Sequence, residues 1–202
     1  MDIGVFIFDT DYSINISELA RELEERGYES LFVPEHTHIP TSRRSPFPGG
    51  GELPKQYSHT LDPFVSLGFA AASTKNLKIG TGICLLPQRD PIVTAKSIAS
   101  LDLMSKGRFV LGLGGGWNVD EMENHGVTYK TRFAMMKEHV LAMKSLWVDE
   151  EAEFHGEYIN FDKSWAYPKP VQKPYPPILM GGETDYTLKR VVDYCDGWFP
   201  RG

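Results

Sequence analysis

The chain has 202 residues and a net charge of -6, with 41% hydrophobic and 24% charged residues, which is the balance of one globular domain. An acidic chain without a clustered basic face is not a typical nucleic-acid-binding protein, and no apolar run approaches the ~18 residues of a membrane span. Its two cysteines, Cys84 and Cys195, form no CxxC pair, so the sequence predicts neither a disulfide framework nor a metal site. We therefore expect a cytoplasmic protein.

Strands and helices alternate along the sequence. Six strands are expected, in order, at 3–8, 30–33, 77–86, the first part of 108–118, 178–181 and 197–199. Five helices are expected at 17–26, 62–71, 91–105, 131–147 and 185–194. Strict alternation implies a parallel sheet with right-handed crossovers, either doubly wound or closed as a barrel.

Two segments interrupt this alternation. Residues 37–60 are rich in proline, glycine, serine and charge, and a loop of this length is usually a binding loop or disordered. Residues 152–176 begin with aromatic residues that predict a short hairpin and end in a proline-rich connection.

A run of glycines follows the fourth predicted strand, within RFVLGLGGGWN at 108–118. A dinucleotide-binding loop needs G-x-G-x-x-G, but the third glycine would fall on Trp117 or Val119, depending on the register. A Walker loop needs Gly-Lys-Ser/Thr, which this stretch lacks. The run therefore indicates a strand whose carboxyl end passes close to something flat or bulky, where a side chain would interfere.

The carboxyl ends of the predicted strands carry glycine, histidine and hydroxyl groups. In a barrel these ends meet at one rim, where enzymes of this architecture have their sites. The turn Gly181–Gly182 leads through Glu183 and Thr184 into a helix, whose free N–H groups would suit an anion. Such a turn is also common in α/β proteins without any ligand.

His36 directly follows the second predicted strand. Imidazole donates and accepts protons near neutral pH, which suits catalysis, but a histidine at such a position is more often a plain loop histidine. With Glu35 and His38 it would form only an incomplete set of metal ligands. Cys84 has no evident partner that would make it a nucleophile, so a packed strand cysteine is the simpler interpretation.

Several motifs in one order carry a family resemblance. They are Pro34–His36, Gly80–Pro91, Leu101–Phe109, Pro177–Gly182 and Asp196–Phe199. Together they resemble the luciferase-like flavin monooxygenase superfamily over essentially the whole chain, and within it most of all the oxidoreductases that depend on coenzyme F420, a deazaflavin. The resemblance implies a (β/α)8 barrel of the TIM type, of which six strands are visible here, in a single domain at 1–202. Two strand-helix units are therefore expected to be lacking, and we expect the chain to be part of a longer one.

The resemblance also assigns roles around the cofactor ring. His36 matches the family's active-site histidine, and Glu35 lies beside it. A non-prolyl cis peptide is implied at Gly82–Ile83 or Ile83–Cys84, against the ring. Gly114, Gly115 and Gly116 would clear the barrel mouth for the ring, and Asn118 would reach its polar edge.

A phosphate site is implied at the other end of the cofactor. Its residues would be Gly181, Gly182, Glu183, Thr184, Thr187 and Arg132. Arg132 is offset by one residue from the family's arginine, and it is equally interpretable as a surface residue at a helix start.

Gly115 also separates this chain from two branches of the superfamily. Luciferases have an arginine at this position and sugar-phosphate dehydrogenases of the F420 group have a glutamate, so neither activity is expected. We expect hydride transfer between reduced coenzyme F420 and a small organic substrate, with residues 37–60 as the substrate wall. The alternatives are an FMN-dependent monooxygenase and a flavin-binding protein without turnover. Family members are commonly dimers, so a homodimer is expected.

Overall fold

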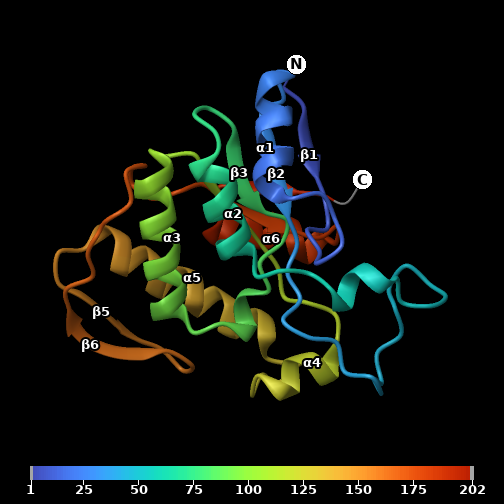
Figure 1. Ribbon diagram of the computed structural model, residues 1–202. Helices are drawn as coiled ribbons and strands as arrows, with labels where there is room; N and C mark the ends of the chain where they lie inside the picture. Colours follow the sequence, from blue (N-terminus) through green and yellow to red (C-terminus); the bar gives the residue numbers. More distant parts are fainter. Residues whose placement is uncertain (1, 201–202) are drawn as a thin grey trace.

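The computed structural model of the protein describes residues 2–200, and its main element is a six-stranded parallel sheet in the order β1-β2-β3-β4-β7-β8 (Figure 1). The strands are β1 Gly4–Phe6, β2 Ser30–Val33, β3 Lys78–Thr81, β4 Phe109–Leu113, β7 Ile178–Gly181 and β8 Gly197–Phe199. Each neighbouring pair runs parallel. The α/β class expected from the alternating pattern is confirmed.

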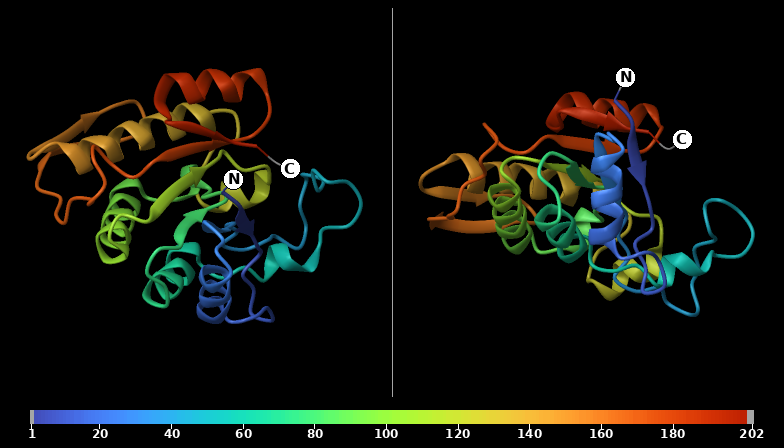
Figure 2. Two further views of the ribbon diagram at one scale, coloured as in Figure 1. Left: turned by 90° about the horizontal axis from the view of Figure 1, so that it is seen from above. Right: turned by 45° about the horizontal axis from the view of Figure 1, so that its top comes forward.

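The expected helices pack along one face of this sheet. They are α1 Ile16–Glu25, α2 Pro63–Ala72, α3 Pro91–Ser105, α5 Arg132–Val148 and α6 Asp185–Tyr194. Each contacts the next in that order, so the helices form one continuous outer layer (Figure 2). Local signals fix their starts: Asp62 and Asp90 cap α2 and α3, and each is followed by a proline at the first helical position.

The sheet is strongly curled, which makes it a half-barrel. A Cβ at Gly82, just after β3, would lie 3.1 Å from the Phe199 ring and 3.2 Å from the Phe6 ring. Phe6 and Phe199 come from the two edge strands, β1 and β8, so both edges curve toward the middle of the sheet. Their rings fill the concave side, as side chains fill the interior of small barrels. The barrel-type fold with six strands is thus confirmed.

The structure confirms one further prediction and adds three details. The hairpin is present as β5 Ala152–His155 and β6 Asn160–Ser164, which pair antiparallel. The strand predicted at 77–86 is too long, because regular pairing ends at Thr81 and the short 3-10 helix η2, Leu86–Gln88, follows. A short helix that was not predicted, α4 Val119–Asn124, follows the glycine run. A second 3-10 helix, η1 Lys55–Ser58, lies in the long loop.

The hydrophobic core lies between the sheet and its helices. Strand residues such as Leu31, Ile79 and Leu111 are fully buried there, together with Met136 and Val140 of α5. Within the described residues, no helix is long and apolar enough to cross a membrane. The core leaves the carboxyl ends of the strands free to form a cavity.

Candidate functional site

A cavity of about 1020 Å³ opens at the carboxyl ends of the strands. Its wall also includes residues of the long loop and the first turns of α5 and α6. All the predicted site residues line it except Cys84 and Asn118. The strand ends therefore do meet at one rim, and a volume of this size suits a cofactor together with a small substrate.

The side chains of Cys84 and Asn118 are fully buried and do not line the cavity, so the predictions that they contact the cofactor are wrong. The interpretation of Cys84 as a packed strand cysteine is confirmed. Burial raises the pKa of the Cys84 thiol well above its ordinary value, and the nearby Glu35 carboxylate raises it further. Cys84 is thus a packed, protonated thiol. Asn118 caps α4 instead of reaching into the cavity, since its Oδ1 accepts the N–H of Glu121 at 3.4 Å.

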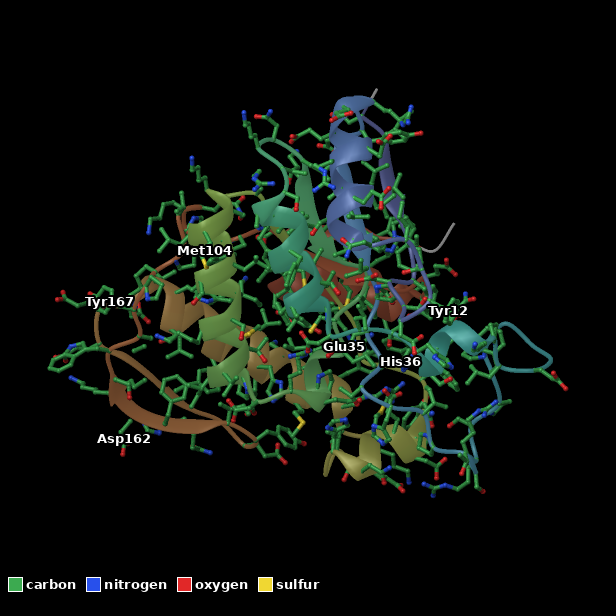
Figure 3. All side chains as sticks on the ribbon, viewed as in Figure 1. Tyr12, Glu35, His36, Met104, Asp162 and Tyr167 are labelled. Atoms are coloured by element: carbon green, nitrogen blue, oxygen red, sulfur yellow. The ribbon has the colours of Figure 1, made fainter. Side chains whose placement is uncertain are left out.

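His36 is held by a carboxylate that sequence reasoning missed. Its Nδ1 lies 2.9 and 3.0 Å from the two carboxylate oxygens of Glu121, and both side chains are nearly inaccessible, at 6% and 1% exposed. His36 is at the point where the chain leaves β2 for the long loop, close to α4 (Figure 3). Because Glu121 fixes Nδ1, the other ring nitrogen, Nε2, is the one left to exchange a proton with a ligand.

Glu35 lines the cavity, but its carboxylate forms hydrogen bonds with groups of the protein itself. It accepts the backbone N–H of Leu85 at 2.7 Å and Nε of Arg89 at 2.5 Å. Arg89 also pairs with Asp62 at 2.7 Å. Burial alone would lower the pKa of Arg89, but the two carboxylates raise it above its ordinary value. Glu35 therefore joins the segment after β2 to the segment after β3. It lies beside His36 in the cavity lining, as expected, and its assignment to the cofactor site stays a prediction.

The floor of the cavity is formed by glycines and by two apolar side chains. A Cβ at Gly114 would lie 2.0 Å from Cδ1 of Ile83, and a Cβ at Gly115 would lie 2.7 Å from the Phe133 ring. The peptide between Gly82 and Ile83 is cis, as the family resemblance implied. The space beside the glycines was predicted to be open for the ring, but the side chains of Ile83 and Phe133 fill part of it. These two side chains give the floor of the cavity an apolar surface.

Two arginines flank Phe133 at one end of the cavity. The guanidinium carbon of Arg132 lies 4.3 Å from the centre of the Phe133 ring, and that of Arg190 lies 3.7 Å from it. Burial lowers the pKa of Arg132, and the charge of Arg190 lowers it further. Neither forms an ion pair within the described part of the chain, and the buried Nε of Arg132 has no hydrogen-bond partner. Glu183 lines the same part of the cavity, so two arginines face one carboxylate there, and the excess of positive charge favours an anion.

The first turn of α6 adds to this anion site. Thr184 caps the helix by accepting the N–H of Thr187 at 3.2 Å, and their hydroxyl oxygens lie 3.1 Å apart. Gly182 has φ of +122°, and a Cβ there would lie 2.8 Å from Oγ1 of Thr187. Hydroxyls, open N–H groups and two arginines together fit a phosphate group of a cofactor.

Arg190 belongs to this site but was not predicted. It follows Thr187 by three positions, so the two side chains lie on one face of α6. That spacing was the available signal. Arg132, by contrast, was predicted with a competing interpretation as a surface residue, and it does line the cavity.

A parallel half-barrel with a pair of arginines and a buried histidine at its carboxyl rim is typical of the class of α/β barrel proteins that have their sites at that rim. The family model described as luciferase-like monooxygenase matches residues 1–202, and the chain belongs to this family.

Comparisons with individual proteins agree with this family assignment. An uncharacterized protein of Mycobacterium tuberculosis is 44% identical over 202 residues, which cover 98% of this chain and 71% of that protein. The structure of an F420-dependent secondary alcohol dehydrogenase, in complex with an F420-acetone adduct, has a TM-score of 0.79 at 25% identity, covering 98% of this chain and 57% of that one. Monooxygenase RslO1 from Streptomyces bottropensis also has a TM-score of 0.79 at 25% identity, covering 95% and 56%. The chain therefore spans a little more than half the length of these two solved structures.

Proposed function

We propose that the protein is an oxidoreductase that binds reduced coenzyme F420 across the cavity and reduces a small organic substrate, or catalyses the reverse reaction. The observation that carries this proposal is the layout of a single cavity. An unpaired arginine couple lies at one end of it, and a carboxylate-bound imidazole lies at the other. A cofactor with a phosphate-bearing side chain and a flat ring would place its charge and its reacting part in these two places.

The cofactor, when bound, supplies a hydride that adds to an electrophilic carbon. The protein positions the cofactor and the substrate, and it protonates the substrate. Arg132, Arg190 and the first turn of α6 bind the phosphate, and Ile83 with Phe133 supports the ring plane. Nε2 of His36 gives a proton to the substrate oxygen as the hydride arrives at carbon, so a carbonyl becomes an alcohol. Glu121 keeps the imidazole in the orientation that this transfer needs.

The second candidate is an FMN-dependent monooxygenase that uses oxygen as co-substrate. The likeness to monooxygenase RslO1, at the same TM-score as the alcohol dehydrogenase, favours it. The anion site would accept the phosphate of either cofactor, so binding measurements must decide between them.

The experiment titrates the purified protein with F420 and with FMN and follows the quenching of cofactor fluorescence. We expect saturable binding of F420, weaker binding of FMN, and competition by inorganic phosphate. Arg190→Met should weaken F420 binding by about 10- to 100-fold, as expected for loss of a charged hydrogen bond.

Lys189→Met is the matched control for this variant. Lys189 is the neighbouring cation on α6 and is exposed, so the charge change is the same while the cavity is untouched. Tighter binding of FMN than of F420 would favour the second candidate. No saturable binding of either cofactor would refute both.

A further inference from the structure

We propose that the end of the cavity beside His36 selects an uncharged ring compound, such as an aryl or cyclic ketone, and rejects its carboxylated counterpart. This inference rests on the proposed function and names the substrate class for it. It comes from three aromatic side chains, Phe47, Tyr57 and Trp117, which we call the aromatic wall.

The aromatic wall is continuous and touches His36. Tyr57 and Trp117 lie with ring centres 5.3 and 6.0 Å from the imidazole, both at steep angles to it. Phe47 closes the wall, at 5.2 Å from Tyr57 and 6.2 Å from Trp117. Ring edges and faces at these distances favour a further ring packed in the same tilted manner.

The apolar character extends along the cavity beyond the wall. Phe8 packs on Tyr57 with ring centres 4.8 Å apart, and Phe6 packs on Phe8 at 5.6 Å. Both phenylalanines line the cavity. A substrate held next to His36 is therefore surrounded by aromatic carbon on the side away from the protein core.

The charged groups at this end are already paired. Glu121 is bound to His36, and the carboxylate of Glu35 is bound to Arg89 and to Leu85. Among the described residues, the arginines that line the cavity are Arg132 and Arg190, which lie beside Phe133 at the anion site. Arg43 lines a separate hollow next to Phe47 and does not line the cavity. A carboxylate beside the aromatic wall would lose its hydration without gaining a free cation, which is strongly unfavourable.

The test compares three ligands that share one aryl ketone group: acetophenone, 4-acetylbenzoate and the methyl ester of 4-acetylbenzoate. The ester has nearly the size of the acid but no charge. Binding is measured by isothermal titration calorimetry on the protein saturated with its cofactor, so that the anion site is filled. We expect both neutral ketones to bind at least about 10-fold more tightly than the acid.

Two variants test whether ketone binding depends on the aromatic wall. Phe47→Ala, a change in a loop residue, should weaken binding of acetophenone at least about 5-fold without changing cofactor affinity. Trp165→Ala removes a ring of the same kind that is 76% exposed and does not line the cavity, and it should change neither affinity.

The inference and the proposed function fail in different ways. Absence of cofactor binding refutes the proposed function, and the ketone series is then run on the Arg190→Met variant, in which the anion site is weakened. In either setting, equal or tighter binding of the acid, or no binding of any of the three ligands, overturns the inference.

Discussion

The two ends of the cavity are built by different means. The anion site uses the start of α6, which offers backbone N–H groups and a threonine pair, and adds two arginines on either side of one ring. The end beside His36 uses side chains from the segment after β2, the long loop, the end of the glycine run and α4, which are far apart in the chain. Among the described residues, the two arginines at one end form no ion pair, whereas the carboxylates of Glu35 and Glu121 at the other end are both paired. The comparison teaches that one cavity can separate the binding of a charged group from chemistry on a neutral one.

The largest effect should come from a change that damages the anion site alone. Gly115→Leu places a side chain where the Phe133 ring now lies, since even a Cβ would be 2.7 Å from that ring. Phe133 would have to move, and the two arginines that stack on it would lose their common support. We expect loss of measurable cofactor binding by fluorescence titration, while acetophenone still binds beside His36.

Gly68→Leu is the control for this substitution. Gly68 lies in α2, where an added Cβ would meet no atom within 4 Å. It should leave cofactor affinity unchanged. Unaltered cofactor affinity in Gly115→Leu would show that Phe133 does not organise the anion site.

The second largest effect should be a loss of turnover that is confined to the end of the cavity beside His36. Glu121→Gln keeps the shape of the side chain but removes the negative charge that holds Nδ1 of His36. Because a positioned general acid contributes about 100-fold or more to a rate, we expect kcat to fall by about 100-fold. Cofactor affinity and ketone affinity should stay within about 2-fold of the parent, since neither the anion site nor the aromatic wall is changed.

Glu123→Gln provides the comparison on the same helix. Glu123 is exposed and pairs with Arg44, so its loss removes a surface ion pair and leaves His36 untouched. Turnover should then remain near that of the parent. A loss of affinity and turnover together in Glu121→Gln would instead indicate a general disturbance of the fold.

The difference between the two ends also explains what the sequence could predict. Periodicity and alternation predicted the parallel sheet and its helices, because these depend on local patterns, whereas the barrel form was implied by the family resemblance. The Gly181–Gly182 turn and Thr184 were found for the same reason, since a helix start is visible within a few residues. The family resemblance added His36 and the cis peptide at Gly82–Ile83.

Neither local sequence patterns nor the family resemblance predicted the side chains that contact His36. Glu121 lies 85 positions from His36 along the chain, and Phe47 and Tyr57 lie in a loop without a repeating pattern. One signal was present: Asn118 followed three residues later by Glu121 is similar to a capping box, which predicts a helix start. In the structure Asn118 does cap α4, but Glu121 turns away to His36. The Asn118 half of the capping pattern is present in the structure, whereas Glu121 departs from it, and this departure marks Glu121 as the functional residue.

The smallest effect should come from a residue that supports both ends. His139 of α5 is 2% exposed, and its Nδ1 lies 3.1 Å from the carbonyl oxygen of Leu86. The same helix begins with Arg132, while the backbone N–H of Leu85 is bound by Glu35 beside His36. Burial lowers the pKa of His139, although Leu86 and the nearby Asp90 and Glu138 carboxylates oppose this.

The direction of the pH effect follows from this lowered pKa. As the pH falls below about 6.5, the unfolded chain takes up a proton at His139 that the folded protein still excludes, so the free energy of unfolding decreases. The slope is at most about 1.4 kcal/mol per pH unit, and the loss ends once the pH is below the lowered pKa of the folded state. In His139→Asn, the amide N–H can still donate to Leu86 but does not titrate. Urea unfolding between pH 7 and pH 5 should therefore show a shallower decrease in the variant.

His155→Asn serves as the control, because His155 lies in the hairpin with a side chain that is 56% exposed. It should keep the slope of the parent. Because the folded protein does not take up this proton, the affinity of the folded protein for phosphate and for ketone should not change through His139 over this range. A slope in His139→Asn equal to that of the parent would mean that another group carries the acid sensitivity.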